Sequence, residues 1–278
     1  MIDIASVGGI LLAVLGIVGG MMMEGGSLSQ IAQPTALIIV LGGTMGAVML
    51  QFPLNIFWAA MKQMTRVFVT RKGDSEAVIR RIVGFGLKAR KTGVLSLDDD
   101  LGTVADPFLH QALQLAIDGT EPEEVRKIMQ LDLDHKAEFA EQMPQVLEAA
   151  GGYAPTVGII GAVLGLIQVM QHLDDISAVG RGIAVAFVAT IYGVGLANLI
   201  LLPVAGKMKI RQREDQVLKT IMLEGVISIL EGMNPRMIET KLRAYVFDGK
   251  AGPANTAPLT SEPAFASVPL AEAIEAEA

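Results

Sequence analysis

The sequence predicts an all-α integral membrane protein with four transmembrane helices and a helical cytoplasmic domain inserted between helices 2 and 3. Residues 153–170 and 182–206 contain no charged side chain. At about 1.5 Å per residue, each is long enough to approach or cross a hydrocarbon core of about 30 Å. Residues 4–23 and 34–52 are two similar uncharged spans. The chain is also 51% hydrophobic, which is more apolar than an ordinary soluble domain.

The distribution of basic residues predicts the orientation of these spans. The 51–151 segment and residues 207–213 are rich in lysine and arginine, whereas residues 24–33 contain neither and residues 171–181 contain only Arg181. Basic residues accumulate on the cytoplasmic side, so both termini and the large central segment are expected in the cytoplasm. The first span has no basic region before it, so we interpret it as a retained helix rather than a secretory signal.

Composition excludes several classes of function. The formal net charge of −7 argues against a nucleic-acid partner, and the absence of cysteine excludes disulfides and thiolate chemistry. The histidines, His110, His135 and His172, are too far apart in sequence to show a metal-ligand spacing. The sequence shows no nucleophile–base pair, phosphate loop or metal cluster, so we expect neither an enzyme nor a bound cofactor.

The central segment, residues 53–150, is predicted to fold as a compact helical domain. Asp74 or Ser75 can cap a helix that runs to about Lys91 and stops at Gly93. Apolar side chains recur at helical spacing along it, so one face should be buried against other helices.

Further helices are expected between this first cytoplasmic helix and the third span. Asp106-Pro107 starts a second helix, which ends before Gly119. Thr120–Glu123 has the form of a capping box with an internal proline and would open a third helix toward Asp132. Another helix from about Asp134 is expected to continue into the third span.

After the fourth span, Lys207–Glu231 is predicted to form a charged, amphipathic stalk. Asn234-Pro235 breaks it, and Arg236–Phe247 forms a last short helix. The remaining residues are rich in Pro, Ala, Ser, Thr and Glu and cannot bury enough apolar surface to fold. The predicted divisions are 1–52 (transmembrane helices 1 and 2), 53–150 (cytoplasmic helical domain), 151–206 (transmembrane helices 3 and 4), 207–250 (stalk and C-terminal helix) and 251–278 (disordered acidic tail).

Small residues recur at four-residue spacing in the spans. Gly42 and Gly46 lie in the second span, and Gly161 and Gly165 in the third. Such faces let helix backbones approach closely in lipid. They can pack within one chain or between copies around an axis, and the second interpretation predicts a homo-oligomer.

None of the four spans contains Asp, Glu, Lys, Arg or His. Ion translocation normally needs an ionisable group in the membrane. If this protein moves ions, the carrier carboxylate must therefore belong to a partner chain, while Thr190 and Tyr192 line the wall beside it. The alternative for Thr190 is a hydroxyl that bonds back to a carbonyl one turn earlier. Pro155 and Pro203, at matching ends of helices 3 and 4, either set helix geometry or create flex points.

Several strings carry a resemblance to a known family. APTVGIIGAVLGL, followed by a short loop with two aspartates and AVAFVATIYGVGLANLILLPVAGK, resembles helices 3 and 4 of MotA-type flagellar stator proteins, the MotA/PomA branch of the MotA/TolQ/ExbB superfamily. ARKTGVLSLDDD resembles the family's rotor-facing segment, and LEGVISILEGMNPRMIETKLRAY its stalk and C-terminal signature. The resemblance covers about residues 1–247.

The resemblance implies a function and partners. It implies a stator subunit of the bacterial inner membrane that couples proton flow to torque and forms a homo-oligomer, a pentamer in the family. The partners implied are a MotB-like, single-span, peptidoglycan-binding subunit and a protein of the rotor switch complex. The central domain would then face the rotor.

The resemblance also implies roles for individual residues. Pro155 and Pro203 match prolines that couple ion flow to conformational change, and Thr190 matches a threonine near the partner's proton-carrying aspartate. Ala162 lies where sodium-driven relatives have a second threonine, which favours protons. The implied rotor contacts are Arg90, Lys91, Asp98 and Asp99, with aspartate where family members often have glutamate.

Two other functions are also compatible with the sequence. An ExbB/TolQ-like energiser shares the core but resembles a three-span arrangement. A membrane scaffold that conducts nothing would use Thr190 and Ala162 only for assembly. From sequence alone, Arg90 and Asp98 would also fit a solvated surface with weak, exposed ion pairs.

Overall fold

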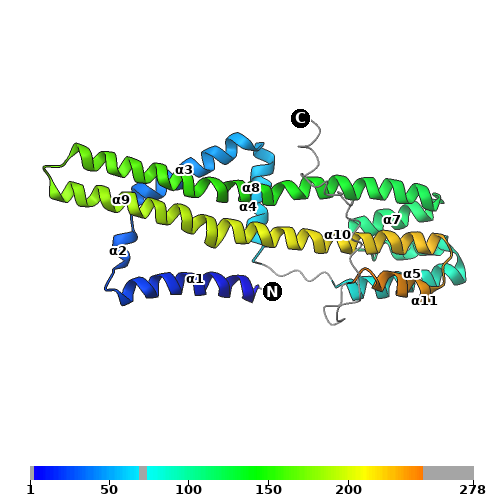
Figure 1. Ribbon diagram of the computed structural model, residues 1–278. Helices are drawn as coiled ribbons and strands as arrows, with labels where there is room; N and C mark the ends of the chain where they lie inside the picture. The colour runs from blue at the N-terminus through cyan, green and yellow to red at the C-terminus, as the bar shows by residue number, and fades with distance from the viewer. Residues whose placement is uncertain (1–2, 69–73, 247–278) are drawn as a thin grey trace, which may run out of the picture. The chain divides into compact units, whose positions relative to one another are not determined.

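The computed structural model describes residues 3–68 and 74–246 (Figure 1). These residues contain helices and no strand, which confirms the all-α prediction. The predicted disordered tail, 251–278, lies outside the described residues. The helices are α1 (Ile4–Met23), α2 (Leu28–Ile31), α3 (Pro34–Gln51), α4 (Leu54–Arg66), α5 (Ser75–Thr92), η1 (Val94–Leu97), α6 (Asp98–Leu101), α7 (Pro107–Ile117), α8 (Pro122–Gln171), α9 (Ile176–Gly195), η2 (Leu196–Leu201), α10 (Leu202–Leu230) and α11 (Pro235–Arg243).

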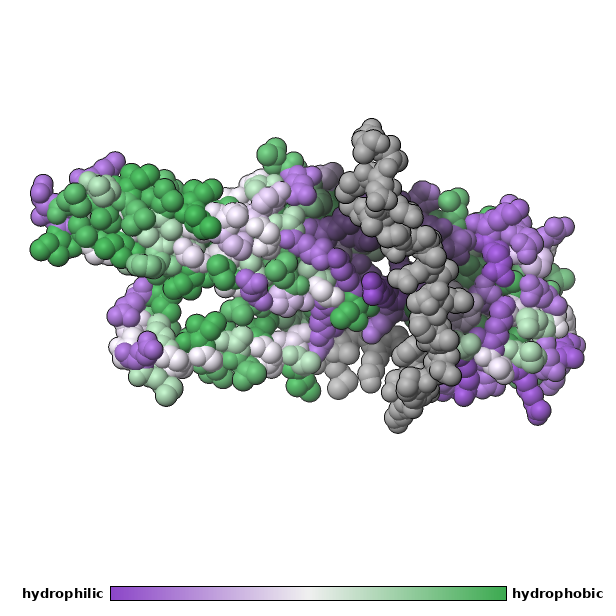
Figure 2. Space-filling model, in the orientation of Figure 1, coloured by the Kyte–Doolittle hydropathy of each residue, from purple (hydrophilic) through white to green (hydrophobic). Residues whose placement is uncertain are grey.

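Four helices of the described chain are long and apolar enough to cross a membrane, as predicted. They are α1, α3, α8 and the continuous rod formed by α9, η2 and α10. The paired ends of α8 and α9 present mainly apolar residues, whereas hydrophilic residues gather at the end that carries α5, α7 and α11 (Figure 2). This change of surface along the same long helices agrees with a membrane part that continues into an aqueous part.

Two of the predicted helix starts, those at Asp74 and Asp106, are confirmed by their caps. The Asp74 carboxylate accepts a hydrogen bond from the Ala77 backbone N–H at 3.1 Å, and α5 ends at Gly93, whose φ of +88° favours glycine. Asp106 caps α7 in the same way by accepting from the N–H groups of Phe108 and Leu109.

The predicted break between two helices near residue 133 is wrong. A single helix, α8, runs from Pro122 to Gln171, and Glu121 precedes it without a side-chain capping bond, so the predicted capping box does not form. Between Glu123 and Met143 the sequence contains no glycine or proline, so nothing interrupts the helix.

The prolines of helices 3 and 4 also lie differently from the sequence expectation. Pro155 does not open a helix but lies inside α8, and Pro203 does not close one but follows η2, a short π-helical segment, at the start of α10. Neighbouring helices and local π-helical turns can re-satisfy backbone groups that a proline leaves free. Both long helices therefore continue past their prolines toward the end that carries α5, α7 and α11.

The predicted amphipathic stalk is buried on all sides at its far end. Residues 221–229 of α10 are buried without exception, because α5, α7, the start of α8 and α11 surround them. Close contact with α5 requires glycine at 225, since a Cβ there would lie 2.6 Å from a methyl of Ile82. The last helix among the described residues is α11, Pro235–Arg243, which is shorter than predicted and is capped by Asn234.

Helix α1 is packed against the rest of the described chain only near its N-terminal end. It buries none of its residues. Asp3, its N-cap, forms ion pairs with Lys207 and with Arg211 of α10, the latter at 3.2 Å. The first span is therefore attached to the base of the fourth while its apolar sides stay available to lipid or another chain.

Candidate functional site

Helices α8 and α9 approach so closely that glycine is required on both. A Cβ at Gly193 would lie 2.4 Å from the carbonyl oxygen of Ala154, and one at Gly165 would lie 2.8 Å from the carbonyl oxygen of Gly182. The small face of the third span thus packs within the chain. By contrast, a Cβ at Gly42 or Gly46 would meet nothing within 4 Å, so no residue that the structure describes packs closely on that face.

Thr190 lies on α9 beside this close contact. Its hydroxyl donates to the carbonyl of Ala186 at 3.3 Å, which is the local alternative considered from sequence. A Cβ at Gly158 of α8 would lie 3.4 Å from the Thr190 Cα. Because a hydroxyl that donates one bond keeps its lone pairs, Thr190 can still accept a hydrogen bond from a protonated group outside the chain.

Tyr192 is not on the same side of α9 as Thr190. Two residues along an α-helix correspond to a rotation of about 200°. The Tyr192 hydroxyl donates to the carbonyl of Ile31 at 2.5 Å and accepts from the backbone N–H of Gln33 at 3.4 Å. The structure therefore gives Tyr192 a contact with the connection between α2 and α3 and does not place it beside Thr190.

The two proline segments are neighbours in space. Gly151, one turn before Pro155, packs against Leu202, the residue before Pro203, and a Cβ at Gly151 would lie 2.7 Å from a Leu202 methyl. Neither proline can donate a hydrogen bond to the carbonyl one turn earlier. Helices α8 and η2–α10 thus each lack one backbone hydrogen bond near the level where Gly151 meets Leu202.

Ala162 follows Pro155 by seven residues, so both lie on the same side of α8. Each is half-buried. Ala162 offers a methyl group and no oxygen to that side of the helix. Ala162 itself would give no side-chain ligand to a cation that had lost its water, whereas a proton carried by a carboxyl group needs none.

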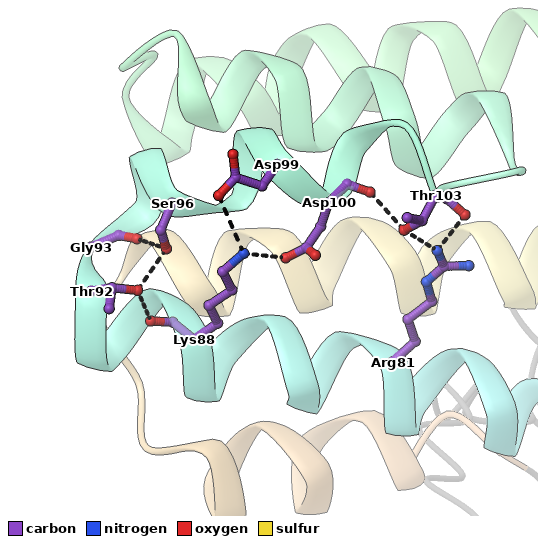
Figure 3. Close-up of polar contacts among 8 residues, drawn as sticks. All are labelled: Arg81, Lys88, Thr92, Gly93, Ser96, Asp99, Asp100 and Thr103. Carbon is purple, nitrogen blue, oxygen red and sulfur yellow. Dashed lines mark hydrogen bonds and ion pairs between the residues drawn. The ribbon is translucent and has the colours of Figure 1, made fainter.

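The charged residues predicted to face the rotor separate into two groups. Lys88 of α5 forms ion pairs with Asp100 at 2.8 Å and Asp99 at 3.9 Å, as Figure 3 shows. Asp98, at the start of α6, is exposed and forms no ion pair with a described residue. Arg90 and Lys91 line a different cleft, against α11. The structure does not bring Arg90 and Asp98 together as a contacting pair.

An ionic cluster that was not predicted from the sequence lies beside the core formed by α5, α7, α8, α10 and α11. Glu224 of α10 forms ion pairs with Arg126 of α8 and, at 2.8 Å, with Lys241 of α11. Burial alone would raise the pKa of Glu224, but the hydrogen bonds from Arg126 and Lys241 outweigh it and hold that pKa below its usual value. The only sequence signal was a single glutamate within the apolar run IMLEGVISIL.

Thr44 gives a direct test of packing between α3 and its neighbours. Its side chain is fully buried, and its hydroxyl has no hydrogen-bond partner among the described residues. We expect Thr44→Val to raise the unfolding temperature in detergent. The change keeps the shape of the side chain and removes a buried, unsatisfied hydroxyl, whose desolvation costs about 1–3 kcal/mol. Thr44→Ala is the control, since it also removes the hydroxyl but leaves a void. If Thr44→Val destabilised the protein as much as Thr44→Ala, the hydroxyl would have a hydrogen-bond partner in the assembly.

Comparison with known proteins assigns the chain to a family. Residues 101–220 match the sequence family described as the MotA/TolQ/ExbB proton channel family, and residues 7–84 match the one described as Motility protein A N-terminal. Motility protein A of Bacillus subtilis (strain 168) is 34% identical over 249 residues, which cover 88% of this chain and 91% of the relative. This chain belongs to the MotA/TolQ/ExbB proton channel family.

Two solved structures support the membership in three dimensions. The flagellar MotAB stator complex from Bacillus subtilis contains a chain that aligns with a TM-score of 0.80 and 34% identity, covering 88% of this chain and 96% of that one. The structure of C. jejuni MotAB aligns with a TM-score of 0.84 and 28% identity, covering 90% and 98%. The resemblance predicted from the sequence strings is thereby confirmed, and with it the multi-pass membrane class. The roles of the individual site residues stay predictions.

Proposed function

We propose that this protein is a flagellar motor stator subunit that, with a MotB-like partner, couples proton flow across the inner membrane to torque on the rotor. The observation that carries the proposal is similarity to Motility protein A and MotAB chains along nearly their whole length, through both membrane and cytoplasmic helices. The MotB-like partner would be a single-span, peptidoglycan-binding subunit. The chain would lie in the bacterial inner membrane with both termini in the cytoplasm, as the basic residues indicate.

The proton carrier must be supplied by the partner, because the four spans contain no ionisable side chain. We assign Thr190 as the group that meets it. When the partner's carboxyl group is protonated, it can donate a hydrogen bond to the Thr190 oxygen, and when it is ionised it cannot. Loading and release of the proton thus change the contact between the partner helix and α9.

In this proposal the change is transmitted by a closely packed pair of helices that can bend where Pro155 and Pro203 lie. The glycine contacts hold α8 and α9 together. Pro155 and Pro203 weaken the backbone at the level where Gly151 meets Leu202. One charge moved through a membrane potential of 100 mV releases about 2.3 kcal/mol, so each step can drive only a low-barrier rearrangement of this kind.

The same helices carry the movement into the cytoplasm. The rod of α9, η2 and α10 continues from the membrane into the core around residues 221–229, and α8 does the same in the opposite direction. Helices α5 and α6 pack on or next to that core and carry the predicted rotor contacts, Arg90, Lys91, Asp98 and Asp99. The face with Gly42 and Gly46 and the apolar sides of α1 are not covered by any described residue, and they supply surface for a homo-oligomer.

The proposed function is tested by motility. A stator-deleted strain that receives this protein and its partner should swim, and Thr190→Val should reduce its swimming speed roughly tenfold, the effect of about 1.4 kcal/mol on a step barrier. Thr190→Ser keeps the oxygen and should retain motility. Equal swimming speeds of the Thr190→Val and Thr190→Ser variants would show that the Thr190 oxygen takes no part in proton transfer.

The ion is tested in the same strain. Swimming should not depend on external sodium at fixed pH and should stop when a protonophore is added. Dependence on sodium would contradict the inference from Ala162. Failure to swim, despite membrane insertion and partner binding, would instead favour an ExbB/TolQ-like energiser or a scaffold.

A further inference from the structure

The basic end of α5 borders an open cleft. The cleft has a volume of about 450 Å³. Its walls come from the last turns of α5 and the first turn of α11, two segments far apart in the sequence. The lining residues are Leu87, Arg90, Lys91, Asn234, Pro235 and Arg236.

Packing between α5 and α11 fixes these walls. The two helices run antiparallel, because Arg243 near the end of α11 pairs with Glu76 near the start of α5 at 3.6 Å. Farther along, a Cβ at Gly86 would lie only 3.2 Å from a methyl of Ile238. The C-terminal end of α5 therefore meets the N-terminal end of α11, and the cleft lies between two well-packed elements.

The cleft has cations on both walls and no carboxylate in its lining. Arg90, Lys91 and Arg236 form no ion pair with any residue that the structure describes. Two other cations on the same helices are already neutralised, because Lys88 forms an ion pair with Asp100 and Arg243 forms one with Glu239. Three exposed, uncompensated positive charges around one depression form a surface complementary to an acidic ligand.

The nature of that ligand follows from the other lining groups. The first amides of α11 are already bonded, because Asn234 accepts from Arg236, Met237 and Ile238 through its side chain or carbonyl. The helix N-terminus therefore offers no free amides to a phosphate group. Leu87 is 48% exposed and adds an apolar surface between the cations. A ligand with carboxylates and an apolar side chain can contact both the cations and Leu87, whereas a small inorganic anion would make no apolar contact with Leu87.

We propose that this cleft binds an acidic peptide segment of a cytoplasmic partner protein, with Arg236 acting together with Arg90 and Lys91. The partner's carboxylates pair with the three cations, and one of its apolar side chains packs on Leu87. The inference rests on the proposed function, in which Arg90 and Lys91 face the rotor, and it adds α11 to that interface. Asp98 and Asp99 do not line this cleft, so they would contact a different part of the partner.

The test uses the full-length protein, purified in detergent with its MotB-like partner, and a fluorescein-labelled peptide composed of glutamate and leucine. Binding is followed by fluorescence anisotropy at low salt. Arg236→Gln should weaken binding roughly three- to tenfold, the effect of losing one charge pair in a cleft. Arg213→Gln is the matched control, because Arg213 is exposed on α10, forms no ion pair with a described residue and lies outside the cleft. Circular dichroism verifies that both variants are folded.

Two further probes decide between ligands. A peptide with glutamine in place of glutamate, or serine in place of leucine, should bind more weakly than the original. Three results would overturn the proposal. The first is equal weakening of binding by Arg236→Gln and Arg213→Gln, and the second is unchanged binding of the glutamine peptide. The third is binding of tripolyphosphate together with peptide binding that does not depend on leucine. The motility test is independent: failure to restore swimming with normal peptide binding would contradict the stator function, not the cleft.

Discussion

Gly193→Ala is expected to destabilise the protein by about 3 kcal/mol or more and to abolish motility. The added methyl group would lie 2.4 Å from the Ala154 carbonyl oxygen and 3.2 Å from the Gly158 Cα. Both contacts are with backbone, so no side chain can rotate away, and α8 and α9 would have to separate. Overpacking of this kind costs about 1–3 kcal/mol when side chains can adjust and more when they cannot. Thermal unfolding in detergent and co-purification of the MotB-like partner measure the effect.

Gly195→Ala is the matched control for this change. It lies two residues farther along the same chain, and a Cβ there would meet nothing within 4 Å. Alanine also has a higher helix propensity than glycine, by about 1 kcal/mol. The control should therefore be neutral or slightly stabilising. If both variants unfolded at the same temperature as the parent, the close approach of α8 and α9 would be disproved.

Sequence reasoning found the membrane helices because hydrophobic length is a local property. The uncharged spans and the caps at Asp74 and Asp106 each depend on a few consecutive residues, and the structure confirms them. The course of α8 was misjudged for the opposite reason. Pro155 looked like a helix start, but a proline can lie inside a long helix where packing with a second helix compensates for the lost bond.

The functional residues show the same division between local and long-range information. Placing Thr190 on the fourth span required only its position in the apolar run. Helix geometry alone puts Tyr192 on a different side of α9 from Thr190, but it does not reveal the partner of Tyr192, whose hydroxyl reaches Ile31, 161 residues earlier. The cleft that joins Arg90 to Arg236 likewise depends on the antiparallel packing of α5 and α11. No spacing within the sequence encodes that contact, so it could not be predicted.

Glu224→Gln is expected to lower the free energy of unfolding by about 2–4 kcal/mol. The Glu224 side chain is 12% exposed, and it faces both Arg126 and Lys241. Glutamine keeps the shape but leaves two cations without their shared carboxylate. This loss extends below the roughly 3–5 kcal/mol typical of a broken buried pair, because the two cations are themselves about one-third exposed. Thermal unfolding of the purified complex measures the change, and Glu214→Gln, an exposed position on α10, is the control.

The pH dependence of stability distinguishes charge from packing at this cluster. The pKa of Glu224 is below its ordinary value of 4.5 in the folded state, so its stabilising contribution is complete above the unfolded-state pKa and is lost as the pH falls through the folded-state pKa. The parent protein should therefore lose stability on acidification below about pH 4.5, and Glu224→Gln should lose less over the same interval. Parallel curves for the two proteins would mean that Glu224 acts by shape alone. A flatter curve for the variant would show that one carboxylate holds α8, α10 and α11 together, so that displacement of either long helix reaches α11 and the cleft that it forms with α5.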